Sequence, residues 1–217
     1  KLLELNLLQA PQVADAILGN EMFKHYNRKL IAERCEQAGL LHRALEHYTD
    51  LSDFKRVLRN AHAIANLEWL AAWFGQLNNA DRLACLNEML AANLRQNLPA
   101  AVKVCVRWAE ELTPQACIKL FENYKSVDGV FFFLREIIDL TQDAEAHFKY
   151  IEAAAKLGQL SEVERIVRQS NYYEPERVRD FLKEAKLPDQ LPLVIVCDRF
   201  NFVDDLTRYL YKNNMQK

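Results

Sequence analysis

The chain has 217 residues, half of them apolar and 27% charged, and it carries a formal net charge of −2 with a pI near 6.3. Its 5 glycines and 6 prolines are too few for the many tight turns of a β-rich chain of this length, so strands are not expected. Basic and acidic residues are interspersed, which argues against the uncompensated basic stripe of a nucleic-acid-binding face and hence against a nucleic-acid partner.

Amphipathic segments with the 3.6-residue period of a helix follow one another along the chain. The first begins with leucines at 2, 3, 5, 7 and 8, and the clearest later ones span 79–92, 99–112 and 175–186. The apolar stripes of these three segments are Leu83, Leu86 and Leu90; Val102, Cys105, Ala109 and Leu112; and Val178, Phe181, Leu182 and Ala185. The spacing predicts short helices, each of which buries its stripe against a neighbour.

Prolines and small polar residues predict where helices begin. A proline in the first turn costs nothing, because the N–H that it lacks would have no partner there. Prolines stand just ahead of apolar runs at Pro11, Pro99, Pro114, Pro175 and Pro188. Thr113 is a predicted N-cap, and Ser161 with Glu164 matches a capping box.

Two distant segments share a helix–glycine–helix pattern. Gly39 follows AERCEQA and Gly158 follows IEAAAKL, and both precede a further apolar run. A glycine in the left-handed conformation ends one helix and lets the next fold back at once. The two glycines are 119 residues apart, close to four repeats of about 30 residues.

Together these patterns predict an all-α fold, an α-solenoid of stacked antiparallel helix pairs with about 14 short helices in an elongated curved rod. No linker or low-complexity run interrupts the chain, so 1–217 is predicted to be a single continuous solenoid segment. Because the chain starts inside a helical pattern and without methionine, we expect it to be a fragment of a longer leg.

The motifs of common active sites are absent from the sequence. All five glycines are isolated, so no phosphate loop is present, and no C-x-x-C pair offers a zinc site. The nearest metal-like cluster is Cys35, His42 and His47, but histidines five residues apart do not share a helix face. We therefore expect no enzyme, no cofactor and no metal, and the sequence identifies no binding residue.

Several remaining candidates have a simpler structural interpretation. The cysteines at 35, 85, 105, 117 and 197 lie in apolar patterns and are interpreted as reduced core thiols. Neighbouring carboxylates such as Glu110 with Glu111 and Asp204 with Asp205 diverge around a helix and are interpreted as surface charge. The aromatic run at 130–134 and the tryptophans Trp69, Trp73 and Trp108 favour helix packing over a ligand pocket. The basic residues Lys55, Arg56 and Arg59 are interpreted as a solvated helix face.

The longest apolar stretches, 130–134 and 191–197, fall short of the roughly 20 residues that a membrane-spanning helix needs. Direct membrane insertion is therefore not expected.

Several blocks closely resemble the leg of clathrin heavy chains. In order they are APQVADAILGN (10–20), CEQAGLLHRALEHY (35–48), NLRQNL (93–98), HFKYIEAA (147–154), EPERV (174–178), FLKEAKL (181–187) and DQLPLVIVCDRF (189–200). The resemblance places the chain in the ankle and the beginning of the distal leg, a zone of clathrin-type helical repeats.

The resemblance implies a structural role in the coat of endocytic and Golgi-derived vesicles. It implies other clathrin heavy-chain legs as partners and a cytoplasmic position on coated pits and coated vesicles. Adaptor appendages are a possible further partner, and no light chain is expected on this segment. Two functions stay open: a stiff scaffold that supports cage assembly, and an adaptor- or peptide-binding surface in a groove between helix pairs.

Overall fold

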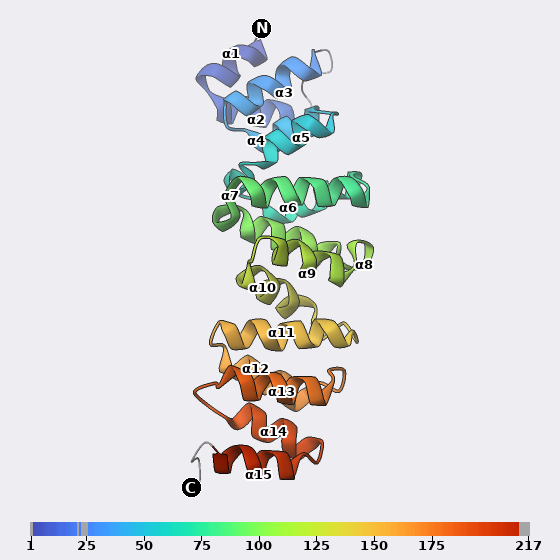
Figure 1. Ribbon diagram of the computed structural model, residues 1–217. Coiled ribbons are helices and arrows are strands. Elements are labelled where there is room, and N and C mark those ends of the chain that lie inside the picture. The colour runs from blue at the N-terminus through green and yellow to red at the C-terminus, as the bar shows by residue number, and fades with distance from the viewer. Residues whose placement is uncertain (1, 21, 23–25, 213–217) are drawn as a thin grey trace. The chain divides into compact units, whose positions relative to one another are not determined.

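The computed structural model describes residues 2–20, 22 and 26–212. In these ranges the chain forms fifteen α-helices and two short 3-10 helices and no strand, so the all-α prediction is confirmed (Figure 1). The helices divide into two compact units, residues 1–112 and 113–217. Each unit is described by itself below.

In the first unit, helices pack against the next helix or the next but one along the chain. Its helices are α1 (Leu2–Gln9), α2 (Pro11–Gly19), α3 (Arg28–Gln37), α4 (Leu41–His47), α5 (Leu51–Leu58), η1 (Ala61–Ala63), α6 (Leu67–Trp73), η2 (Phe74–Gln76), α7 (Asn79–Arg107) and α8 (Ala109–Leu112). Of the leucines in α1, Leu3 and Leu7 are buried, whereas Leu2, Leu5 and Leu8 are exposed.

In the second unit, helices contact both the next helix and, in several cases, the next but one. Its helices are α9 (Pro114–Asn123), α10 (Val127–Ile137), α11 (Ala144–Lys156), α12 (Leu160–Gln169), α13 (Pro175–Ala185), α14 (Leu191–Arg199) and α15 (Val203–Lys212). Contacts of α9 with α11, of α11 with α13 and of α12 with α14 are the pattern of stacked helix hairpins.

The helix α7 consists of two helices joined at Asn93, whose backbone is extended (φ −158°, ψ 90°). The side-chain oxygen of Asn93 accepts a hydrogen bond from the N–H of Gln96 at 3.1 Å and so caps the second half. The helix start predicted at Pro99 is therefore wrong, because the cap at Asn93 begins that helix and Pro99 lies inside it.

Left-handed residues connect several of the helix pairs. Gly39 has φ +78° and Gly158 has φ +70°, as the sequence pattern predicts. Lys125 (φ 53°) and Asn201 (φ 58°) make the same turn. At each of the four positions, the N–H of the left-handed residue donates a hydrogen bond to the carbonyl three residues before it. The N–H of the following residue donates to the carbonyl five residues before that residue, and the donor–acceptor distances are 2.8–3.5 Å. Glycine thus marks only some of these turns.

We expect Gly39→Ala to lower the free energy of unfolding by about 1 kcal/mol, which is the cost of a left-handed conformation for a residue with a Cβ atom. A Cβ atom at Gly39 would meet no surrounding atom within 4 Å, so no clash with the rest of the fold adds to this cost. Urea unfolding followed by circular dichroism measures it. Ala38→Gly, one residue earlier in the right-handed region, is the matched control. Equal stability of Gly39→Ala and the unchanged chain would contradict the prediction.

Some of the predicted helix starts are confirmed, and others are wrong. Pro11, Pro114 and Pro175 are first residues of helices, and the Thr113 hydroxyl accepts from the N–H of Ala116 at 3.4 Å. The capping box at Ser161 is wrong, since the turn at Gly158 restarts the chain as helix α12 already at Leu160.

Two further expectations need correction. Helix α14 begins at Leu191, three residues after Pro188, and Pro192 occupies its first turn. In α13, Val178 and Leu182 are buried as predicted, but Ala185 is exposed because it is the last residue of the helix.

Candidate functional site

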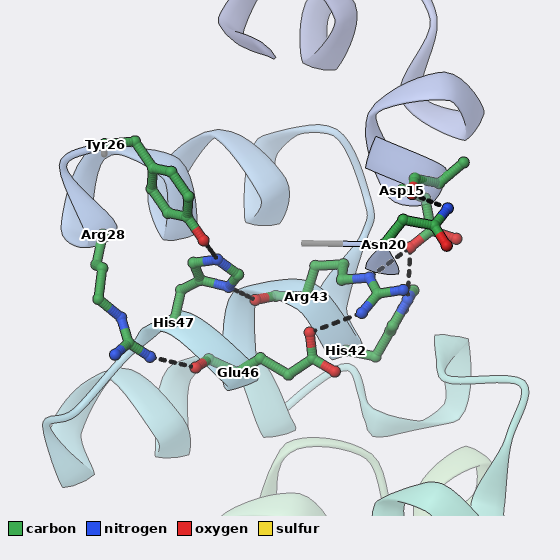
Figure 2. A network of polar contacts seen from close by, with 9 residues as sticks. Asp15, Asn20, Tyr26, Arg28, His42, Arg43, Glu46 and His47 are labelled. Atoms are coloured by element: carbon green, nitrogen blue, oxygen red, sulfur yellow. Dashed lines mark hydrogen bonds and ion pairs between the residues drawn. The ribbon is translucent and has the colours of Figure 1, made fainter. Parts of the chain in front are cut away.

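A network of polar contacts joins α2 to α4 in the first unit (Figure 2). The guanidinium of Arg43 is its centre: Nε donates to Asp15 Oδ1 at 2.6 Å and Nη1 donates to Glu46 Oε2 at 2.9 Å. His42 Nε2 lies 3.0 Å from the same Asp15 oxygen. Burial alone would raise the pKa of Asp15, but the hydrogen bonds and charges of Arg43 and His42 hold it below its usual value. The network ties α2 to α4, and its charged groups are paired with one another.

His47 points away from His42 to the other side of α4 (Figure 2). Its Nδ1 lies 2.8 Å from the carbonyl oxygen of Arg43 and donates to it, so Nε2 accepts from the hydroxyl of Tyr26, also at 2.8 Å. Burial lowers the pKa of His47, and the charge of Arg28 lowers it further. The ring is therefore a neutral core group.

The same geometry decides the metal question raised by Cys35, His42 and His47. Burial raises the pKa of the Cys35 thiol to about 12, so it is not a thiolate at neutral pH. No group of three metal-binding side chains occurs in the described ranges. The structure does not bring the three residues together as ligands.

The buried His47 predicts a pH dependence of stability. Its folded-state pKa lies below the unfolded value of 6.5, so the unfolded chain binds more protons in this range. We expect the free energy of unfolding to fall as the pH is lowered from 7 towards 5. His47→Gln is expected to flatten this part of the curve, whereas the partly exposed His62→Gln is the control at a different site. Urea midpoints measured across this pH range test it, and an unchanged slope in His47→Gln would refute the assignment.

A tyrosine, a glutamate and an arginine form a contact in each unit. Tyr48 donates to Glu36 Oε2 at 2.7 Å, and Arg56 Nη2 donates to the same oxygen at 2.9 Å. In the second unit, Tyr150 donates to Glu162 Oε2 at 2.7 Å and Arg165 Nε donates to it at 3.0 Å. Burial, followed by the neighbouring carboxylate, raises the pKa of both tyrosines.

The basic helix face around Lys55 carries little free charge. Arg56 pairs with Glu36 and Asp53, and Arg59 Nε lies 2.6 Å from Glu88. These pairs neutralise the arginines, in agreement with the interpretation as a solvated helix surface rather than a phosphate-binding face.

The aromatic candidates pack between helices as predicted. Trp73 lies edge-on to Phe54, with ring centroids 4.9 Å apart, and Trp108 Nε1 donates to the carbonyl of Ala71 at 2.7 Å. In the run 130–134 only Phe132 is exposed, at 44%. These contacts place the rings of Trp73 and Trp108 in the packing between helices.

In the part of the chain that the structure describes, the thiols are buried and Asp205 is paired. All five cysteines are free and buried. Asp205 accepts from Arg179 at 2.9 Å and lies 3.5 Å from Lys183, so it joins α15 to α13 rather than standing free on the surface. A Ser–His pair does occur at Ser170 and His147, with Oγ and Nδ1 3.0 Å apart. Both residues are buried, and His147 Nε2 donates to the carbonyl of Thr141, so the pair holds a loop in place.

Sequence reasoning missed the most strongly bonded polar side chains. Arg82 and Arg199 donate hydrogen bonds to backbone carbonyls at the ends of earlier helices. Asn97 is fully buried, and both the nitrogen and the oxygen of its side-chain amide form hydrogen bonds. Asn97 lies in the block 93–98 that carries the family resemblance, but nothing local in the sequence marks its partners.

None of the helices that the structure describes is both long and apolar enough to cross a bilayer.

Comparison with known proteins agrees with this helical architecture. A family model described as "Clathrin: Region in Clathrin and VPS" matches residues 1–98 and 108–217. The chain is 61% identical over 217 residues to the clathrin heavy chain of Drosophila melanogaster, 56% over 217 residues to that of Dictyostelium discoideum and 58% over 216 residues to human clathrin heavy chain 2. Each alignment covers 100% of this chain and 13% of the relative. The chain therefore belongs to the clathrin heavy-chain family.

Proposed function

We propose that this chain is a structural segment of a vesicle coat, in which it supports the leg of a clathrin heavy chain and the assembly of legs into a cage. The observation that carries the proposal is the identity of 53–61%, over nearly all of this chain, to a 13% portion of clathrin heavy chains from animals, plants and Dictyostelium. The partners would be other heavy-chain legs, and the location would be the cytoplasmic face of coated pits and vesicles. A catalytic role forms no part of the proposal.

The contacts within each unit suit a stiff support. Buried aromatic and aliphatic side chains fill the space between the helices, and ion pairs such as Arg43–Asp15 join helices that are not consecutive in the chain. Many weak contacts between such legs would make assembly cooperative and reversible. The identity to heavy chains along the whole segment favours this scaffold over adaptor binding as the main role.

A chimera tests the coat function directly. The matching segment of the Drosophila clathrin heavy chain is replaced by residues 1–217 of this chain, and cage assembly is scored by electron microscopy. We expect cages of normal appearance. A chimera that is folded by circular dichroism but assembles no cages would contradict the proposal, and a chimera with Asn97→Leu serves as the control for loss of assembly through unfolding.

We also propose that residues 1–217 form one continuous α-solenoid. The proposal rests on the uninterrupted helical pattern and on the family match along the chain. Small-angle scattering of the isolated chain is expected to give the distance distribution of an elongated particle. The distribution of a compact sphere would contradict it.

A further inference from the structure

A groove of about 390 Å³ lies in the second unit, between the α9–α10 turn and the C-terminal half of α11. Its apolar floor is formed by Val127, Val130 and Ala153. Val130 and Ala153 are 5% and 4% exposed, so the floor is continuous with the core of the unit. The groove is large enough for one or two side chains of a partner.

The rim of the groove carries three lysines and two glutamates. Lys149 lies 2.7 Å from Glu122 and 3.3 Å from Glu152, and Lys156 lies 2.7 Å from Glu152. The ammonium group of Lys125 forms no ion pair or hydrogen bond with any residue in the described part of the chain. The rim therefore has one more positive than negative charge, and the unpaired positive charge is that of Lys125 at the α9–α10 turn.

The backbone of Lys125 gives a second, independent observation. It is left-handed, with φ 53°, at the turn position that glycine occupies in the two equivalent turns at Gly39 and Gly158. Glycine would make this turn without strain, whereas a residue with a Cβ atom pays for it in stability. A strained residue whose charged side chain has no partner in its own chain points to a role outside the fold.

We propose that this groove binds an acidic segment of a protein partner, with one apolar side chain of the segment on the floor and a carboxylate at Lys125. The nearby ammonium of Lys156 shares its single carboxylate partner, Glu152, with Lys149, and so is available to a second carboxylate. Charge complementarity and an apolar floor fit this occupant better than an uncharged one. The inference does not depend on the coat function.

Peptide binding by the whole 217-residue chain tests the proposal. The probe is a short fluorescein-labelled peptide of glutamate and leucine, and its reference is the same peptide with every glutamate replaced by glutamine. Fluorescence anisotropy at low salt is expected to show saturable binding of the first peptide and at least about fivefold weaker binding of the second. Binding of the first peptide is also expected to weaken as salt is added.

Lys125→Gly separates the structural from the binding role of this residue. We expect it to raise Tm, because the left-handed strain is removed, and to weaken binding of the glutamate peptide about fivefold. The matched control is Asn201→Gly, at the equivalent left-handed turn between α14 and α15, where asparagine is less strained than lysine. It is expected to raise Tm and leave binding unchanged. Lys156→Gln is expected to weaken binding without a rise in Tm.

Three results would overturn the proposal. The first is no saturable binding of the glutamate peptide by the unchanged chain. The second is equal binding of the peptide by Lys125→Gly, Lys156→Gln and the unchanged chain. If Lys125→Gly raised Tm without weakening binding, Lys125 would have no function beyond its place in the turn. The third is binding of phosphatidylserine vesicles through these lysines in the absence of peptide binding, which would assign the surface to a membrane.

Discussion

Replacing Asn97 by leucine is expected to lower the free energy of unfolding by about 3 kcal/mol or more. The side chain is 0% exposed, and Nδ2 donates to the carbonyls of Arg59 and Met89 at 2.9 and 2.8 Å. Its oxygen accepts from the backbone N–H of His62 at 2.9 Å. Leucine is similar in size but removes all three hydrogen bonds, and a buried backbone group that is left without a partner costs about 1–3 kcal/mol.

Asn97 reaches back across the kink of α7. It lies in the second half of the helix, and its amide nitrogen donates to the carbonyl of Met89 in the first half. The same amide also bonds the end of α5 and the start of η1. One side chain therefore holds three segments of the first unit together.

Urea unfolding followed by circular dichroism measures this effect. The matched control is Asn123→Leu, the same chemical change at the exposed end of α9, which is expected to alter stability by no more than about 0.5 kcal/mol. If the two substitutions were equally mild, the bonds of Asn97 would not contribute to stability.

The second large effect is expected for Arg82→Met, which should destabilise the first unit by about 2–3 kcal/mol. Arg82 is 7% exposed, and its Nε donates to the carbonyl of Phe74 at 3.0 Å, while Nη2 lies 3.4 Å from the carbonyl of Gly75. Its guanidinium also lies over the ring of Trp108, 4.0 Å from the centroid. Methionine keeps the apolar stem but removes both guanidinium hydrogen bonds and the contact with the Trp108 ring, so the Phe74 carbonyl keeps only the N–H of Leu77, at 3.1 Å.

Two further variants sharpen this result. Arg82→Lys keeps the charge but lacks the planar fork that reaches several acceptors, so we expect most of the stability to be lost with it as well. Arg95→Met lies on the exposed side of the same helix and is expected to be nearly neutral. Full stability of Arg82→Lys would show that charge alone, and not the fork geometry, carries the contact.

The helix hairpin could be predicted at some turns and not at others. At Gly39 and Gly158 the residue type itself favours the left-handed conformation, so the local sequence is sufficient. At Lys125 and Asn201 the same turn forms with residues that do not require it, because packing of the flanking helices determines the backbone there. Ser161, a good cap by pattern, lies inside α12, because the turn at Gly158 lets that helix begin at Leu160.

The sequence likewise predicted the place of some residues of the candidate sites and not of others. The sequence predicted that the cysteines and tryptophans belong to the core, because apolar residues at helical spacing are buried in almost any packing of helices. It could not identify the unpaired Lys125, whose position at a groove depends on where α11 lies against the α9–α10 turn.

The sequence by itself determined the all-α class, the succession of short helices, the glycine turns and the membership in the clathrin heavy-chain family, since these depend on local spacing and on residue identity. Only the tertiary structure decided which polar side chains matter. Asn97 and His62 are 35 residues apart, and Arg43 and Asp15 are 28 apart. Hydrogen bonds between such distant residues form only when stacked helices bring them within about 3 Å, and no pattern within a single helix encodes that distance.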